Sequence, residues 1–409
     1  MATPSDSSSI ATRAILAGLC ASLVGIGLAR FAYTPLIPAL IEARWFAAAD
    51  VVFLGAANLV GYLAGALAGR PLAARLGARR TLQGMMLLAS LAFFACALPV
   101  SVAWFFGWRF LSGLAGGVIM VLAALSVLPQ VPPARRGLAS GAIFLGIGLG
   151  IAASGTVVPP LLDEGLAATW AGLGALSLLL TLASWTWWPR AQAAATHAAA
   201  DPTGNTGAAP ARTGFALNLI YGQYALYAVG LVPMMVFLVD YVARGLHMNT
   251  HTAALFWIVY GAGATVGPMA YGTLGDRIGI GNATRAVLAL QIAAVAALTL
   301  AHGYAVLVPA TFVVGTFPSG VVPLTLGRIR HTLRHDAAAQ GGAWSRATTV
   351  FALFQALAGY AYSWLFGASG GQHRVLMAAG AVALAIALAS DLLLARVAWA
   401  GGTRVQEPA

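Results

Sequence analysis

Two arginines lie inside long apolar stretches of this sequence, where charged side chains are rare. Arg30 has no acidic residue within a helical turn, and Arg109 lies about seven residues inside its stretch. A charge held away from water normally faces a polar cavity or a partner. Three partners are open for Arg30: a bound anion such as a carboxylate, an acidic side chain from another segment, or water at the end of the stretch. Arg109 is either a functional charge or a side chain that extends to water at that end.

A carboxylate and three tyrosines offer further candidate sites. Asp240 ends an apolar stretch and could exchange a proton, although Arg244 follows one helical turn later and could simply pair with it. Tyr221, Tyr224 and Tyr227 are spaced three apart, which places them on one helical face. Their hydroxyls suit a polar cavity, while packing or anchoring at a membrane interface is an equal alternative.

A few neutral polar residues also interrupt apolar stretches. Asn58 and Tyr62 lie four apart, Gln355 stands in a later stretch, and Tyr33 shares the stretch of Arg30. Buried amides need hydrogen-bond partners, so bonds between helices are the alternative to a role in binding. Asp391, five residues before an arginine, is expected to be structural.

Other reactive chemistry is missing from the sequence. It contains no P-loop of the form G-x-x-x-x-G-K-[ST], no H-E-x-x-H and no cluster of cysteine and histidine. Cys20 and Cys96 both lie in apolar stretches, which indicates buried, inert thiols. We therefore expect no enzyme activity, no metal site and no cofactor.

The composition identifies the elements that must position these residues. Of the 409 residues, 60% are hydrophobic and 8% are charged, whereas a soluble domain carries about 25% charged residues. Lipid must therefore surround much of the chain, and spanning helices of about 20 residues each are expected. The net charge of +11 would also suit nucleic acid, but the arginines lie in short segments between apolar stretches, as in cytoplasmic loops. We expect no nucleic-acid partner.

Twelve apolar stretches predict an all-α membrane protein with twelve transmembrane helices. They fall at 14–40, 51–69, 81–100, 102–128, 138–162, 166–188, 215–240, 252–274, 286–302, 304–327, 345–367 and 375–397. Between the sixth and seventh lies a segment rich in Ala, Gly, Pro and Thr, typical of a flexible linker. We predict two six-helix bundles, 1–188 and 214–409, joined by a cytoplasmic linker, 189–213.

The charges of the loops predict the orientation. With the N-terminus in the cytoplasm, most arginines fall on the cytoplasmic side, and only Arg44, Arg244 and Arg374 fall outside. Both termini are then cytoplasmic. The first apolar stretch lacks a small-residue cleavage pattern, so it is expected to remain as the first helix.

The two predicted bundles also repeat one another. At an offset of 202 residues, four positions align without gaps on four others: Gly61, Gly65, Arg75 and Gly77 on Gly263, Gly267, Arg277 and Gly279. Glycines four apart allow two helices to approach closely. Two parallel six-helix repeats are a known plan of transporters.

The loop after the eighth stretch resembles the cytoplasmic loop motif G-x-L-x-D-R-x-G of the major facilitator superfamily. The matching positions are Gly272, Gly275, Asp276, Arg277 and Gly279. The equivalent loop in the first bundle keeps Arg75 and Gly77 but has Ala74 in place of the aspartate. In the superfamily this aspartate helps to close the cytoplasmic side. The resemblance implies that the second loop carries more of that gating role.

Three further strings strengthen the resemblance. Arg109 to Gly117 is similar to the superfamily's motif R-x-x-x-G, whose arginine is associated with proton coupling. The glycines of the fifth stretch resemble those of antiporters, although the Gly-Pro pair of that motif is missing. The string from Gly27 to Pro38, with R-F-A-Y-T-P at its centre, resembles the bacterial YbfB/YjiJ-like branch.

This resemblance implies a secondary active transporter that works by alternating access, with helices 1, 4, 7 and 10 lining a central cavity. We expect a monomer in the bacterial inner membrane that carries a small molecule, coupled to protons through Arg30, Arg109 and Asp240, with efflux slightly preferred. Two alternatives remain open: an uptake permease for an organic anion, and a transporter-like sensor that binds ligand without net flux.

Overall fold

The structure, a computed structural model, describes the chain apart from residues 1–3, 133–135, 190–210, 302, 335 and 401–409. The described residues form helices joined by short connections, with no strand among them. Most of the proposed linker 189–213 lies outside the described residues. Each of the twelve predicted stretches lies on a helix, with ends shifted by a few residues.

The first span is the most irregular one. It consists of α1 (Pro4–Ser22), the π-helical turn η1 (Leu23–Leu28), α2 (Ala29–Phe31) and α3 (Tyr33–Glu42). Pro35 lacks an N–H and cannot donate to the carbonyl of Phe31, which weakens the regular hydrogen-bond ladder there. π-Helical turns inside a helix are frequently found at functional sites. Arg30 is therefore carried by the part of the span whose backbone departs from a regular helix.

The remaining spans are continuous for most of their length. Before the linker they are α4 (Ala48–Leu76), α5 (Ala78–Cys96), α6 (Val102–Val127) with the 3₁₀ turn η2 (Leu128–Gln130), α7 (Arg136–Asp163) and α8 (Leu166–Ser184). After the linker they are α9 (Ala211–Asp240) with the π-helical turn η5 (Tyr241–Gly245), α10 (Thr250–Ile278), α11 (Ile280–Leu300), α12 (Tyr304–Thr332), α13 (Ala337–Ala368) and α14 (His373–Ala400).

Eleven of these spans, within the described residues, are long and apolar enough to cross a membrane. The exception is α5, which begins with Arg79 and Arg80 and carries Gln83 in its second turn. These residues lower its mean hydropathy. Gln83 is satisfied inside the bundle because its amide donates to the carbonyl of Trp185, at 2.7 Å.

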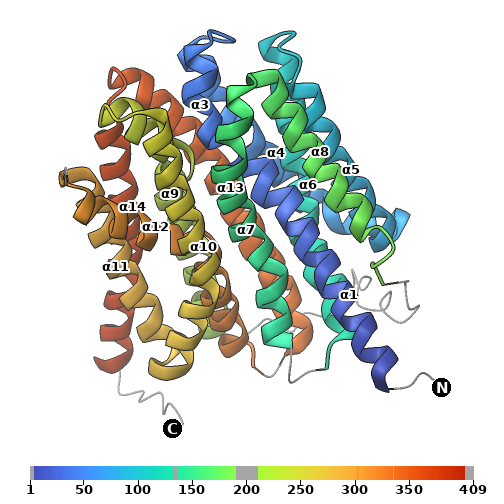
Figure 1. The fold of residues 1–409 in the computed structure, drawn as a ribbon. Helices are drawn as coiled ribbons and strands as arrows, with labels where there is room; N and C mark the ends of the chain where they lie inside the picture. Colours follow the sequence, from blue (N-terminus) through green and yellow to red (C-terminus); the bar gives the residue numbers. More distant parts are fainter. Residues whose placement is uncertain (1–3, 133–135, 190–210, 302, 335, 401–409) are drawn as a thin grey trace.

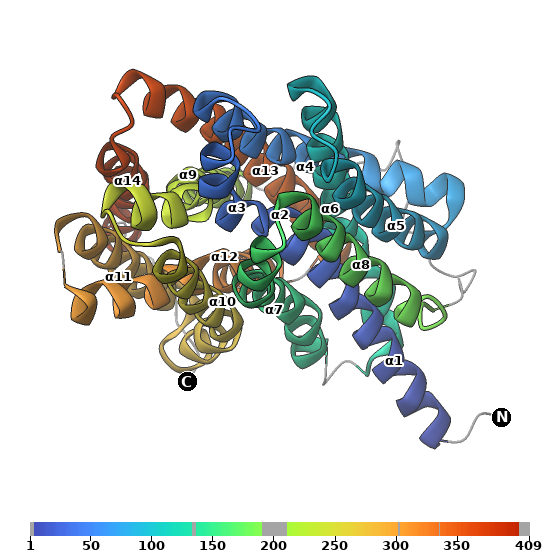
Figure 2. The same cartoon turned by 45° about the horizontal axis from the view of Figure 1, so that its top comes forward.

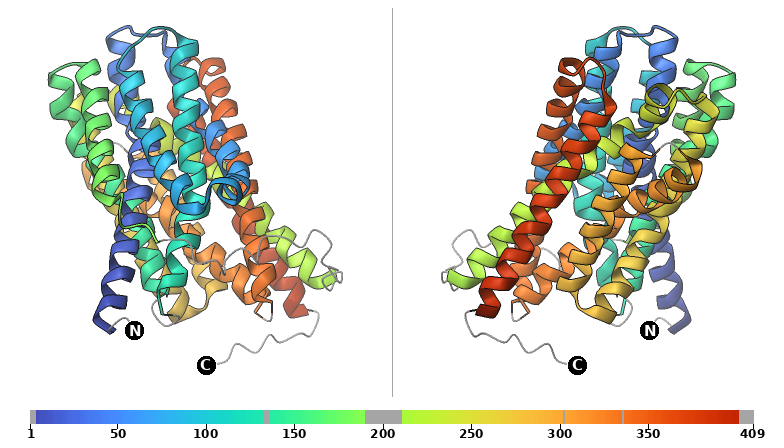
Figure 3. Two further views of the ribbon diagram at one scale, coloured as in Figure 1. Left: turned by 90° about the vertical axis from the view of Figure 1, so that its right-hand side faces the viewer. Right: turned by 90° about the vertical axis from the view of Figure 1, so that its left-hand side faces the viewer.

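The helices run side by side as one bundle, and the start of α1 and the end of α14 lie at the same end of it (Figure 1). We call this the terminal end, and the other, where α3 ends and α14 begins, the opposite end. Views from two sides show the same arrangement (Figure 3). Two turns carry the proposed gating residues. The turn between α10 and α11 lies at the terminal end (Figure 1), and the turn between α4 and α5 follows the end of α4 that points away from the opposite end.

The buried side chains form two clusters that follow the order of the chain. One cluster draws only on residues between Ala14 and Trp188. The other draws mainly on residues between Ile220 and Ala387, with a few from the first part of the chain, such as Phe31 and Leu59. Helices α7 and α10, and α4 and α13, pack against each other between the two parts (Figure 2). This is the packing expected of the two bundles that we propose.

The repeat recurs in the packing of helices. A Cβ atom at Gly61 of α4 would collide with the carbonyl of Phe110 in α6, and one at Gly263 of α10 would collide with the carbonyl of Phe312 in α12. Gly77 and Gly279 end α4 and α10 with φ of 81° and 80°, a conformation that favours glycine. The same close contacts and the same turn therefore occur twice, 202 residues apart.

Candidate functional site

The two arginines of the apolar stretches meet in the first bundle. Arg30 on α2 and Arg109 on α6 are brought together with Tyr33 of α3, and with Asn58 and Tyr62 of α4. We call these five residues the central site. Sequence reasoning named all five, and the structure places them in contact through the backbone of Ala29 and through two tyrosine rings.

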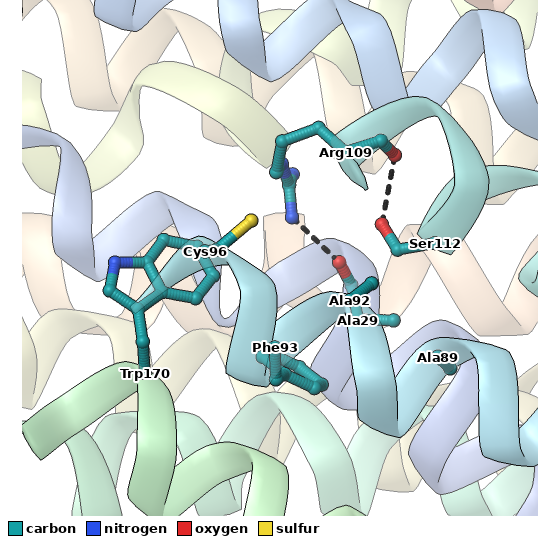
Figure 4. A pocket seen from close by; sticks show the side chains of 8 residues that line it. All are labelled: Ala29, Ala89, Ala92, Phe93, Cys96, Arg109, Ser112 and Trp170. Atoms are coloured by element: carbon teal, nitrogen blue, oxygen red, sulfur yellow. Dashed lines mark hydrogen bonds between the residues drawn. The ribbon is translucent and has the colours of Figure 1, made fainter. Parts of the chain in front are cut away.

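Arg109 turns into the bundle. Its side chain is 3% exposed, and its Nη1 donates to the carbonyl oxygen of Ala29 at 2.9 Å (Figure 4). Its guanidinium carbon lies 4.2 Å from the centre of the Tyr33 ring. The alternative in which Arg109 extends to water at the end of its helix is therefore wrong. The Nε of Arg109 is buried and has no hydrogen-bond partner.

Arg30 lies over a ring face. Its guanidinium carbon is 4.1 Å from the centre of the Tyr62 ring, a cation–π contact. Its Nη2 is buried without a hydrogen-bond partner. No described acidic side chain forms an ion pair with Arg30, so the alternative of a structural salt bridge does not hold in this conformation.

Asn58 ties the helices of the central site together. Its Nδ2 donates to Ser112 Oγ at 2.9 Å and lies 3.5 Å from the Ala29 carbonyl. The Tyr33 hydroxyl donates to the carbonyl of Val51 at 2.6 Å. These bonds join α4 to α2, α3 and α6, as the hypothesis of interhelical hydrogen bonds predicts. The Oδ1 of Asn58 remains buried and unpartnered.

Two small pockets adjoin Arg109, each with a volume of about 10 Å³, room for about one water molecule. One is walled by side chains of the first bundle, including Cys96 and Trp170 (Figure 4). The other lies between the two bundles, and its lining combines both arginines with Met235 and Val236 of α9. In this conformation the central site is closed around its own side chains.

The second bundle closes over this pocket. The Thr34 hydroxyl donates to the carbonyl of Met235 at 2.7 Å, which joins α3 to α9. Gln355 of α13 is fully buried and approaches Met235 Sδ with its Nε2 at 3.8 Å, while its Oε1 has no partner. Gln355 therefore lies behind the wall of the pocket, on the side of the second bundle.

The three tyrosines of α9 do not line that pocket. Tyr224 packs against Phe351 with ring centres 4.5 Å apart, and Tyr227 packs against Phe317 at 5.8 Å. Tyr221 is partly exposed and packs on the same cluster. Packing, one of the two interpretations of this face, is what the structure shows in this conformation.

Asp240 is fully buried at the opposite end of the bundle. Arg244 donates to both of its carboxylate oxygens at 2.5 Å, which confirms the predicted local pair. A third member was not predicted: His373 at the start of α14 places its Nε2 2.6 Å from Asp240 Oδ2. A buried carboxylate that is hydrogen-bonded to an imidazole can exchange a proton with it.

A second buried acid, Asp391, joins four helices near the terminal end. It accepts from Arg285 at 2.6 Å, from Arg328 at 2.9 Å and from Gln223 at 3.0 Å. Its expected structural role fits these contacts. The sequence did not identify these partners, because they lie on α9, α11 and α12, at least 63 residues away.

The residues proposed for gating form no ion pair with one another or with their surroundings among the described residues. Asp276 and Arg277 are exposed. Gly272 is open to its surroundings, whereas Gly275 faces Leu324 of α12. Arg75 and Gly77 in the equivalent loop are exposed as well.

Histidine, cysteine and carboxylate side chains form no group of three suited to a metal ion among the described residues. Cys20 and Cys96 are both buried free thiols.

Comparison with known proteins places this geometry in context. The family model described as "Uncharacterised MFS-type transporter YbfB" matches residues 22–392. A crystal structure of a D-xylose-proton symporter has a similar fold, with a TM-score of 0.70 and 16% sequence identity over 93% of this chain and 96% of that chain. At this identity the likeness concerns the fold. No curated protein matches the chain.

Proposed function

This chain belongs to the family of MFS-type transporters represented by YbfB, and on that premise we propose that it is a secondary active transporter that moves a small molecule by alternating access. The observation that carries the proposal is the pocket between the bundles, which combines Arg30 and Arg109 with Met235 and Val236 of α9. Charged side chains deep in an apolar bundle are costly, so their presence indicates a functional site.

The contacts between the bundles support a conformation that is closed at the opposite end. The bonds from Thr34 to Met235 and from Trp257 to Ser154, at 2.7 and 2.9 Å, join the bundles in the middle and towards that end. Asp276 at the terminal end is unpaired. We assign the terminal end to the cytoplasmic side of a bacterial inner membrane, which places both termini in the cytoplasm, so this conformation faces inward.

Proton coupling is proposed at Asp240 and His373. Protonation of Asp240 would weaken its bonds to Arg244 and His373 and so loosen the junction of α9, η5 and α14. The similar fold of a D-xylose-proton symporter supports a proton as the coupling ion. The glycine-rich α7 favours efflux.

Transport is tested in proteoliposomes with a panel of labelled sugars, amino acids, drugs and organic acids. At least one compound should cross faster than in empty liposomes, and faster still when a pH gradient is imposed. Asp240→Asn should remove the effect of the gradient while exchange of labelled for unlabelled compound continues. Asp163→Asn, an exposed residue at the end of α7, is the matched control and should behave as the parent.

Two results would contradict the proposal. Flux that is the same with and without the gradient would end the coupling claim. Binding of a compound with neither net flux nor exchange would favour a transporter-like sensor instead.

A further inference from the structure

The central site holds two positive charges and no negative one. Arg30 and Arg109 line the same small pocket, so their like charges repel each other. Within the described residues, Asp240 and Asp391 are the buried acids, and each is already bound to an arginine elsewhere. Glu42, the nearest acid along the chain to Arg30, is exposed at the end of α3.

The contacts that the arginines do make are uncharged. Tyr62 and Tyr33 offer ring faces at 4.1 and 4.2 Å, and the Ala29 carbonyl accepts one bond from Arg109 at 2.9 Å. These contacts lower the free-energy cost of burying the two guanidinium groups, but they do not neutralise the positive charge. Arg30 Nη2 and Arg109 Nε remain buried donors without acceptors.

We propose that the central site binds an organic carboxylate, whose oxygens accept hydrogen bonds from Arg30 and Arg109. The inference rests on the proposed transport function and names the substrate class for it. A carboxylate presents two oxygens with about four acceptor positions, which matches the planar donor fork of arginine better than any single neutral group. Bound there, it supplies the missing negative charge and partners for both unpaired donors.

The remaining lining indicates the other half of the ligand. Leu59, Met235 and Val236 give the pocket apolar lining, and two of the three belong to the second bundle. A small carboxylate with an apolar body would contact both bundles at once. Because the pocket has room for about one water molecule in this conformation, the ligand enters as the bundles separate.

The first experiment compares acids with their amides in the unmodified protein. The probes are benzoate, hexanoate and succinate, each with its carboxamide, titrated calorimetrically into full-length protein in nanodiscs. At least one carboxylate should bind, and its amide should bind at least tenfold more weakly, a difference of about 1.4 kcal/mol. Equal affinity of acid and amide, or binding by none of the three acids, would overturn the proposal.

The second experiment removes the charges. Arg30→Gln and Arg109→Gln should each weaken carboxylate binding at least tenfold, while Arg80→Gln, which removes the same charge from an exposed position on α5, should leave it unchanged. Thermal unfolding confirms that each variant is folded. Carboxylate binding that survives both central substitutions would exclude this site.

The two proposals fail in different ways. Arginine-dependent binding without flux in proteoliposomes would leave the site assignment standing and remove transport. Flux of a neutral compound that is insensitive to Arg30→Gln would support the transport function and contradict carboxylate binding at the central site.

Discussion

Four buried or half-buried arginines keep their charge inside this bundle by two different means. Arg285 and Arg328 bind one aspartate, Asp391, whereas Arg30 and Arg109 bind tyrosine rings and a backbone carbonyl. The first arrangement is self-contained and stabilises the second bundle. The second arrangement leaves one N–H donor of each arginine without an acceptor, which is why we propose ligand binding there.

The Asp391 network is expected to be a stabilising element of the second bundle. Asp391→Asn leaves Arg285 and Arg328 without a counter-charge, and breaking a buried pair in this way costs about 3–5 kcal/mol. The lower end is expected, because the Arg285 side chain is 31% exposed and can be hydrated. Denaturant unfolding in detergent measures the loss.

Two companion variants make the Asp391 result specific. Adding Arg285→Gln to Asp391→Asn should restore part of the lost stability, since one unpaired charge is removed. Glu164→Gln, at an exposed turn, should have no effect. An Asp391→Asn protein as stable as the parent would show that the network is dispensable.

Residue types in apolar stretches predicted the central site but not its partners. A charge or amide inside an apolar stretch is visible in the sequence, so Arg30, Arg109 and Asn58 could be named. His373 could not, because it stands at the start of a helix, 133 residues from Asp240, and nothing nearby distinguishes it. Contacts between distant segments depend on how helices rotate and cross, which a single sequence does not specify.

Two pairs of helices, α4 with α6 and α10 with α12, approach each other closely because glycines at the contact have no side chain. Gly61 and Gly65 of α4 face α6, and Gly263 and Gly267 of α10 face α12. The offset of 202 residues predicted this repeat, since spacing of four on one helical face is a local pattern. The breaks at η1 and η5 were not predicted, because π-helical turns leave no distinct pattern in composition.

A pair of glycine substitutions tests the packing of α4. Gly61→Ala would place a methyl group against the Phe110 carbonyl and should lower the free energy of unfolding by about 1–3 kcal/mol. Gly84→Ala on α5 meets no atom within 4 Å and should be neutral, or stabilising by up to about 1 kcal/mol. Gly263→Ala should match Gly61→Ala because of the repeat.

The comparison of these glycine variants uses thermal unfolding of the purified proteins under one set of detergent conditions. If Gly61→Ala and Gly84→Ala behave alike, close approach of α4 and α6 does not limit stability.

At the scale of the molecule, composition was enough to predict a multi-pass membrane protein, and the internal repeat and the loop motif added the resemblance to the major facilitator superfamily. A chain with 8% charged residues has few ways to cover itself in water. The conformation could not be predicted, because under the proposed alternating access the same sequence supports inward- and outward-facing arrangements of nearly equal energy. Only the contacts between bundles distinguish them.

One of those contacts can be converted into a disulfide cross-link between the bundles, which we call the Ala56–Gly359 lock. A Cβ built on Gly359 of α13 lies 3.4 Å from the Cβ of Ala56 on α4, close to the separation found in disulfides. Ala56→Cys with Gly359→Cys, in a background without Cys20 and Cys96, should therefore cross-link on oxidation and hold this part of the interface closed.

The central claim is that two bundles pivot, so that one end opens as the other closes. Pulsed electron spin resonance in nanodiscs tests it most directly, with one pair of spin labels at the opposite end (Glu42 and Gln372) and another at the terminal end (Arg75 and Arg330). Across a range of pH and with the carboxylate panel, we predict that distances lengthen at one end as they shorten at the other. The Ala56–Gly359 lock should leave only the distances of the terminally open form. Distances that never change, or that lengthen at both ends together, would contradict the account.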